Sequence, residues 1–194
     1  MKVGIFGGTF NPPHMGHLIV AESVRSRLDL GKIIFVPSFI SPHKQDRATA
    51  TGEDRLAMVR LAIGGDSRYD VSDLELRRGG VSYTVDTLTE MAKGYPGDDL
   101  FFLLGMDNLL EFDTWKDPQR ITELATIVVM TRPGFAAPEQ PPMEGMMLMY
   151  CDVPEIAISS TAIRESVGRG ESIRFLLPEA VEEYIYRRRL YRQD

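Results

Sequence analysis

Two histidines three positions apart follow a pair of glycines near the N-terminus. His14 and His17 stand after Gly7 and Gly8 in the segment GGTFNPPHMGH. An apolar run over residues 3–6 precedes the glycines and is typical of a buried parallel strand, and a helical pattern begins near His14. A strand, a glycine-rich turn and a helix start present free backbone N–H groups to an anion. Because residues three apart share one side of a helical turn, both imidazoles can face the same phosphate, and the segment predicts a nucleotide site.

Two plainer interpretations of this segment are an ordinary strand–helix connection with surface histidines, and a zinc site. A histidine pair at helical spacing can hold zinc. The single cysteine, Cys151, and the lack of a nearby acidic side chain at ligand spacing disfavour a structural zinc site. The segment also contains neither G-x-G-x-x-G nor G-x-x-x-x-G-K-[ST], so the dehydrogenase fingerprint and the P-loop are both absent.

Length and composition bound the class of protein. The chain has 194 residues, and we expect one domain over residues 1–194, with a helical C-terminal part at 155–194. A net charge of −6 argues against general nucleic-acid binding. One cysteine suits a reducing compartment, the N-terminus lacks a signal-peptide pattern, and no apolar run approaches the ~20 residues that span a bilayer. We therefore expect a cytoplasmic protein without membrane or nucleic-acid partners, and leave open a homo-oligomer.

A second informative segment, ISSTAIR, occupies residues 158–164. Its hydroxyl groups can cap a helix that carries Arg164. Together the two segments resemble the H-x-G-H and I-S-S-T-x-I-R signatures of the nucleotidyltransferase superfamily related to class I aminoacyl-tRNA synthetases. Within that superfamily, the segments PHK, SYT, GMD and TWK at 42–44, 82–84, 105–107 and 114–116 resemble the bacterial nicotinate-mononucleotide adenylyltransferase family. The resemblance spans essentially the whole chain, with one departure at Asn11, where many relatives have aspartate.

The resemblance implies that ATP and nicotinate mononucleotide (NaMN) give nicotinate adenine dinucleotide and pyrophosphate. It implies Mg²⁺ bound mainly through the ATP phosphates, without metal-ligating side chains. The catalytic side chains that it implies are those of His14, His17, Lys44 and Arg164. The ATP-binding residues that it implies are Gly7, Gly8, Thr9, Phe10, Gly16, His43, Ile158, Ser159, Ser160 and Thr161. The NaMN-binding residues that it implies are Thr84, Gly105, Asp107, Trp115 and Arg132.

Several of these residues have a plainer role when taken alone. Ser82 or Thr84 can cap the helix that begins there, and Asp107 can cap the next one. A lone tryptophan such as Trp115 is more often a packing residue than a ligand contact, although here the resemblance favours stacking on nicotinate. Arg164 can pair with Glu165 or Glu171. Lys44 by itself is a solvated surface lysine; by resemblance, it closes over the triphosphate together with His43.

Other functions remain open at this stage. Within the superfamily, the acceptor can be phosphopantetheine, another nucleotide or nicotinamide mononucleotide. A nucleotide-binding regulator without turnover is a second class, disfavoured because two histidines at the phosphate are unnecessary for binding alone. An NAD-dependent oxidoreductase is disfavoured by the missing glycine fingerprint.

The elements that must position these residues alternate between strands and helices. Strands are predicted at 3–6, 33–36, 71–76, 99–104, 126–130 and 146–150. Helices are predicted from about 14, over 52–63, from 82, over 118–124, at the second signature and from 178. This order predicts a doubly wound, Rossmann-like parallel sheet with helices on both faces and the first strand near its centre. Residues 37–51 are expected to form a long polar loop, and residues 135–145 an irregular surface excursion.

Overall fold

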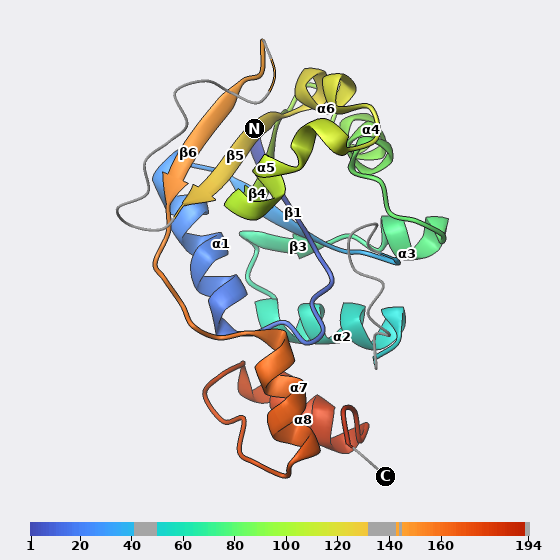
Figure 1. Cartoon of the computed structure of the whole chain (residues 1–194), viewed down its shortest axis with the longest axis vertical. Helices are drawn as coiled ribbons and strands as arrows, with labels where there is room; N and C mark the ends of the chain where they lie inside the picture. Colours follow the sequence, from blue (N-terminus) through green and yellow to red (C-terminus); the bar gives the residue numbers. More distant parts are fainter. Residues whose placement is uncertain (41–49, 132–142, 144, 193–194) are drawn as a thin grey trace.

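The computed structural model describes residues 1–40, 50–131, 143 and 145–192. Within these ranges lies a six-stranded, all-parallel sheet in the order β3-β2-β1-β4-β5-β6 (Figure 1). The strands are β1 (Lys2–Gly8), β2 (Lys32–Pro37), β3 (Tyr69–Val71), β4 (Asp99–Gly105), β5 (Thr126–Thr131) and β6 (Leu148–Asp152). The predicted doubly wound parallel sheet is therefore confirmed, with β1 near its centre.

Helices cover both faces of this sheet. They are α1 (Met15–Leu28), α2 (Gly52–Ile63), α3 (Leu74–Arg78), α4 (Thr84–Gly94), α5 (Met106–Leu110), α6 (Pro118–Leu124), α7 (Ser160–Gly168) and α8 (Glu179–Arg187), with a 3-10 turn η1 (Phe112–Thr114). Buried side chains of α3 to α6 and η1 pack on one face, and those of α1 and α2 on the other. Helices α7 and α8 lie beyond α1 and α2 at one end of the molecule and form a third apolar cluster with α2 (Figure 1).

The apolar runs become central strands because both faces of the sheet are covered. In β1, Ile5 and Phe6 are both buried and belong to the clusters on opposite faces, as do Phe102 and Leu103 in β4. Strand β1 pairs with β2 on one side and β4 on the other, so the connections after β1 and β4 run in opposite directions. This arrangement opens a crevice at the carboxyl ends of β1 and β4, where open α/β sheets bind ligands.

The prediction of a strand over 71–76 is wrong. Only residues 69–71 pair with β2, and Leu74–Arg78 forms the short helix α3. The helix has Asp73 as its N-cap, and Gly79 ends it at φ 69°. The last strand is also displaced, to Leu148–Asp152 instead of 146–150, because its register aligns Leu148 with Ile127 of β5.

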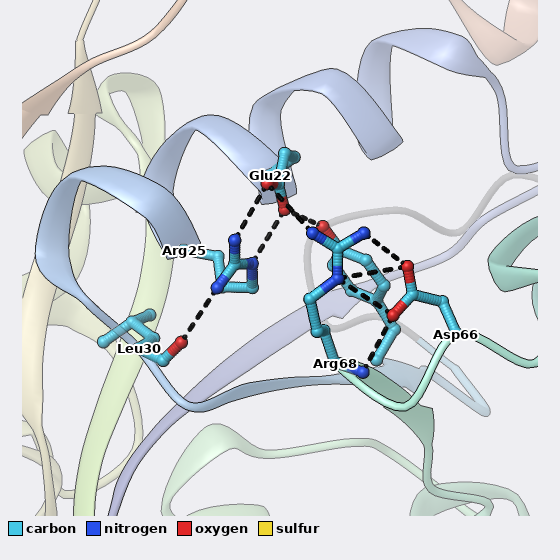
Figure 2. A network of polar contacts seen from close by, with 6 residues as sticks. Glu22, Arg25, Leu30, Asp66 and Arg68 are labelled. Carbon is cyan, nitrogen blue, oxygen red and sulfur yellow. Dashed lines mark hydrogen bonds and ion pairs between the residues drawn. The ribbon is translucent and has the colours of Figure 1, made fainter.

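A charged network ties α1 to the segment before β3 (Figure 2). The Arg25 guanidinium donates to both Glu22 carboxylate oxygens, at 2.8 and 2.9 Å, and Arg68 bridges Glu22 and Asp66. The Arg25 guanidinium lowers the pKa of the Glu22 carboxyl to about 2, with a further contribution from the Tyr69 hydroxyl. The charged groups are partly exposed to solvent, so the network contributes little free energy.

Among the described residues, no helix is long and apolar enough to cross a membrane.

Candidate active site

A cavity of about 1090 Å³ opens at the carboxyl ends of β1 and β4. Both signature segments and the α4 and η1 regions contribute to its walls. The residues that the resemblance implied and that line this cavity are Gly7, Gly8, Thr9, Phe10, His14, His17, Thr84, Trp115, Ile158, Ser159, Ser160, Thr161 and Arg164. Segments far apart in the sequence therefore meet at one site.

Phe10 packs against the glycine-rich turn. Phe10 adopts a left-handed backbone conformation, with φ 49°, and its ring is buried against Phe6 and Phe35. A Cβ atom on Gly8 would come within 2.9 Å of that ring, so only glycine fits there without displacement of the ring. The turn thus brings backbone, without a side chain, to the cavity wall.

The two imidazoles are stacked at the start of α1. The ring centroids of His14 and His17 are 3.8 Å apart and the planes are inclined by 33°. The His14 backbone N–H donates to Nδ1 of His17 at 3.2 Å. Because Nδ1 accepts this bond, the proton of a neutral His17 ring resides on Nε2. His17 is thereby fixed in the tautomer that can donate from Nε2.

His14 is a buried, neutral imidazole. Its side chain is buried, Nδ1 has no hydrogen-bond partner, and burial lowers the pKa of the ring to about 4. A Cβ atom on Gly16 would lie 3.0 Å from the His14 ring, so this glycine makes room for the imidazole. A neutral ring is a hydrogen-bond donor to phosphate that brings no charge repulsion against its stacked neighbour.

We expect His14 to titrate in the free protein with a pKa of about 4 instead of 6.5. The unfolded chain then takes up the proton first, so the free energy of unfolding falls as pH decreases from 6.5 towards 4, by up to about 3 kcal/mol. Ring NMR signals measured against pH test this, because the chain has only three histidines and His14→Gln assigns the resonance. A His14 ring that is half protonated near pH 6.5 would contradict it.

Hydrogen bonds join the second signature segment to the first. Ser159 caps α7, its hydroxyl accepting from the Ala162 N–H at 3.1 Å, as predicted. Ser160 donates its hydroxyl to the Pro12 carbonyl at 2.8 Å, and Arg164 donates from Nη1 to the Asn11 carbonyl at 2.9 Å. Arg164 therefore holds the first signature segment while it lines the cavity.

The alternative pairing of Arg164 with a neighbouring glutamate is not what the structure shows. Its second contact runs from Nη2 to the Thr161 hydroxyl at 3.3 Å, and Glu171 pairs with Arg169 instead.

The start of α4 forms another wall. The N-cap is Tyr83, whose side chain makes no capping bond, so the expected cap by Ser82 or Thr84 is wrong. Ser82 instead accepts from the Phe39 N–H at 3.0 Å, because its hydroxyl faces the end of β2. Thr84 is the first helical residue and lines the cavity. The first N–H groups of a helix have no partner within it, so this wall offers donors to an anion.

Trp115 combines packing with exposure to the cavity. Its ring lies 5.3 Å from that of Phe112 and 6.2 Å, edge to face, from that of Phe102. It remains partly exposed and lines the cavity. Lys116, which follows it, places its Nζ 4.6 Å above the Tyr83 ring and 3.0 Å from the Asp86 carboxylate. An aromatic face thus stands beside a cation at the α4 end of the cavity.

Three residues implied by the resemblance do not line the cavity. Gly16 lies under the His14 ring, Gly105 is the N-cap of α5, and Asp107 is exposed in the first turn of that helix. Their substrate contacts stay predictions. His43, Lys44 and Arg132 lie outside the described residues, as do most of the predicted loop and surface excursion.

The sequence analysis missed two buried charged residues in the cavity wall. Arg55, only 2% exposed, donates from Nη1 to the Thr9 carbonyl at 2.9 Å. Glu75 accepts from the Thr87 hydroxyl, and burial raises the pKa of its carboxyl. A charged residue in an amphipathic segment is normally solvated, so no local signal marks either one.

The described residues contain no group of three or more histidine, cysteine, aspartate or glutamate side chains that could hold a metal ion. Guanidinium and backbone N–H groups only donate and suit phosphate oxygens, whereas a neutral imidazole donates from one nitrogen and can bind a metal through the other. Magnesium bound mainly through the ATP phosphates stays a prediction.

The sheet order and the meeting of both signature segments at one cavity define the class of protein, a nucleotidyltransferase. Comparison with known proteins supports this class. The model of the cytidylyltransferase-like family matches residues 5–166. A solved structure of Plasmodium falciparum nicotinic acid mononucleotide adenylyltransferase complexed with NaAD has the same fold, with a TM-score of 0.78 over 98% of this chain and 97% of that chain. The two sequences are 19% identical, so this likeness concerns the fold alone.

Relatives of higher sequence identity identify the branch of the family. A Thermus thermophilus protein named "Probable nicotinate-nucleotide adenylyltransferase" is 44% identical over 192 residues, covering 99% of this chain and 100% of that protein. A Geobacillus thermodenitrificans protein of the same name is 43% identical, covering 98% of this chain and 86% of its own length. The chain belongs to the cytidylyltransferase-like family and, within it, to the nicotinate-nucleotide adenylyltransferases.

Proposed function

We propose that this protein joins ATP and nicotinate mononucleotide to give nicotinate adenine dinucleotide and pyrophosphate. The observation that carries the proposal is the convergence of both signatures on one cavity, with the His14–His17 pair at its wall. The names of relatives over nearly the full length of the chain support the choice of reaction. A regulator that only binds nucleotide would not require two stacked imidazoles at the phosphate-facing turn.

In the proposed reaction, a 5′-phosphate oxygen of NaMN attacks the α-phosphorus of ATP. The new P–O bond forms as the bond between the α-phosphorus and its bridging oxygen breaks, and pyrophosphate departs with those electrons. A phosphate dianion is already a nucleophile at neutral pH, so the protein needs to position the reactants and stabilise charge. We assign His17 Nε2–H and the His14 ring to the α- and β-phosphate oxygens, and Arg164 to the leaving pyrophosphate.

Magnesium is proposed to arrive on the triphosphate, where it would offset phosphate charge. No step of the chain's own chemistry is assigned to it, because the described residues provide no ligand cage. Lys44 and His43 are proposed for the triphosphate and Arg132 for NaMN, on the family resemblance alone. A cytoplasmic location is proposed from the single cysteine.

The nicotinate ring is assigned to the end of the cavity near Trp115. The aromatic face of Trp115 suits a flat pyridine ring in either the acid or the amide form. The ring carboxylate of the acid would meet the first N–H groups of α4, with the Lys116 cation nearby. Donors alone satisfy a carboxylate but leave the N–H groups of an amide unpaired, so this wall favours the acid.

We therefore expect the protein to prefer NaMN over nicotinamide mononucleotide by at least about tenfold in kcat/KM, or ~1.4 kcal/mol. ATP-dependent pyrophosphate release with each acceptor, and with phosphopantetheine, measures this. Equal kcat/KM with NaMN and nicotinamide mononucleotide would contradict the proposal that the start of α4 presents only hydrogen-bond donors to the ring substituent. Pyrophosphate release with phosphopantetheine alone would reassign the acceptor, and none with any acceptor would refute the proposed function.

A proline at position 84 tests the wall directly. Position 84 is the first helical residue, where proline is well tolerated, and Tyr83 before it already has an extended backbone. Thr84→Pro thus removes one N–H with little change to α4, and the preference for the acid should fall. Thr84→Ala, which keeps the N–H, is the matched control and should keep the preference.

A further inference from the structure

The hydroxyl of Tyr191, near the C-terminus, is buried at the first signature. It donates to the Asn11 side-chain oxygen at 2.7 Å, across 180 positions of sequence. Tyr191 is 8% exposed and Asn11 6% exposed. Burial raises the pKa of the Tyr191 hydroxyl, so it keeps its proton and remains a donor. Neither residue was assigned a role by its pattern in the sequence.

Three further hydrogen bonds join the C-terminal part to residues 11–15. Arg164 donates to the Asn11 carbonyl, Ser160 donates to the Pro12 carbonyl, and the Met15 N–H donates to the Leu176 carbonyl at 2.9 Å. The C-terminal part thus provides hydrogen-bond partners for Asn11, Pro12 and Met15. Asn11 is held at both its backbone and its side chain.

This turn determines where the imidazoles lie. It leads directly to His14, the N-cap of α1, whose backbone N–H in turn orients His17. Pro12 and Pro13 have no backbone N–H, so this stretch can donate little to hold itself in place. Its position therefore depends on outside partners, and Tyr191 is a partner of the Asn11 side chain.

We propose that Tyr191 is a positioning residue for the transfer reaction, whose hydroxyl fixes Asn11 and through it the His14–His17 pair. The inference rests on the proposed adenylyl transfer. Removal of the hydroxyl leaves the Asn11 oxygen buried without that donor, and the turn relaxes. Preorganised donors lose much of their effect when they move by a fraction of an ångström from the transition-state position.

The test is Tyr191→Phe with Tyr184→Phe as matched control. Tyr184 also lies in the C-terminal part, but its hydroxyl donates to the carboxylate of Asp54 on α2, at 2.8 Å, and not to the first signature. Both variants lose one partly or fully buried hydroxyl bond, and thermal unfolding compares their stability. We expect kcat to fall about tenfold in Tyr191→Phe, or ~1.4 kcal/mol, with little change in KM, and to stay near wild type in Tyr184→Phe.

Substitutions at Asn11 give the reciprocal test. Asn11→Asp keeps an oxygen acceptor for the tyrosine and should keep most of the activity. Asn11→Leu removes the acceptor and should reproduce Tyr191→Phe. The double variant Tyr191→Phe/Asn11→Leu should be no slower than the single variants, because one interaction is lost in each case. Full additivity of the two losses would contradict a shared interaction.

A second measurement is independent of turnover. The NMR ring signals of His14 and His17 should shift in Tyr191→Phe and remain in place in Tyr184→Phe. Wild-type ring signals and wild-type kcat in Tyr191→Phe would overturn the inference. If the wild-type protein releases no pyrophosphate with any acceptor, the proposed function fails, while the ring signals still decide whether Tyr191 positions the histidines.

Discussion

Replacement of His17 by alanine is expected to lower turnover about a hundredfold without unfolding the protein. The side chain is only partly buried, so its loss leaves the core intact. Its Nδ1 accepts from the His14 backbone N–H, so the ring proton resides on Nε2, the nitrogen that does not take part in that bond. Loss of one preorganised donor to a developing charge typically costs ~3 kcal/mol of transition-state stabilisation. Single-turnover measurement of pyrophosphate release tests this result.

His17→Asn separates the two functions of the ring. The asparagine oxygen can still accept from the His14 N–H, but it offers no donor in the place of Nε2. Activity close to that of wild type in this variant would show that local structure, and not donation to phosphate, is the role of His17. His14→Ala should act in the same direction, and the double variant should cost less than the sum, because the two rings are stacked and are proposed to donate to neighbouring oxygens of the same triphosphate.

Replacement of Arg164 by alanine is expected to lower kcat by about a hundredfold, or ~2.7 kcal/mol. Two losses combine in this variant. The cavity loses a cation assigned to the leaving pyrophosphate, and the Asn11 carbonyl loses the guanidinium that holds it at 2.9 Å. Hydrogen bonds to charged groups contribute more than neutral ones, so the effect should exceed that of Tyr191→Phe.

Two further variants interpret the Arg164 result. Arg164→Lys keeps the charge but lacks the two Nη donors of the planar guanidinium, so it should recover only part of the activity. Arg169→Ala, near the end of the same helix, removes an exposed arginine paired with Glu171 and should change little. Equal kcat in Arg164→Ala and Arg169→Ala would remove Arg164 from the proposed mechanism.

The parts of this fold that could be predicted are those with a local cause. Apolar runs such as residues 99–104 became central strands, and the hydroxyl run before Arg164 became the cap of α7. The strand prediction over 71–76 failed where the pattern was short and ambiguous. Its alternation resembled a strand, whereas only Tyr69–Val71 pair with β2 and α3 begins at Leu74.

The candidate site also has parts that the sequence could predict and parts that it could not. The sequence by itself determined the two signature segments, because glycine, histidine and hydroxyl residues in a fixed order carry both their backbone shape and their chemistry. Only the tertiary structure decided that Arg55 and Glu75 are buried in the cavity wall and that Tyr191 reaches Asn11. Burial and contact across 180 positions depend on how the helices pack against the sheet. No local pattern encodes that packing, since the same arginine, glutamate or tyrosine would be solvated on a free helix face.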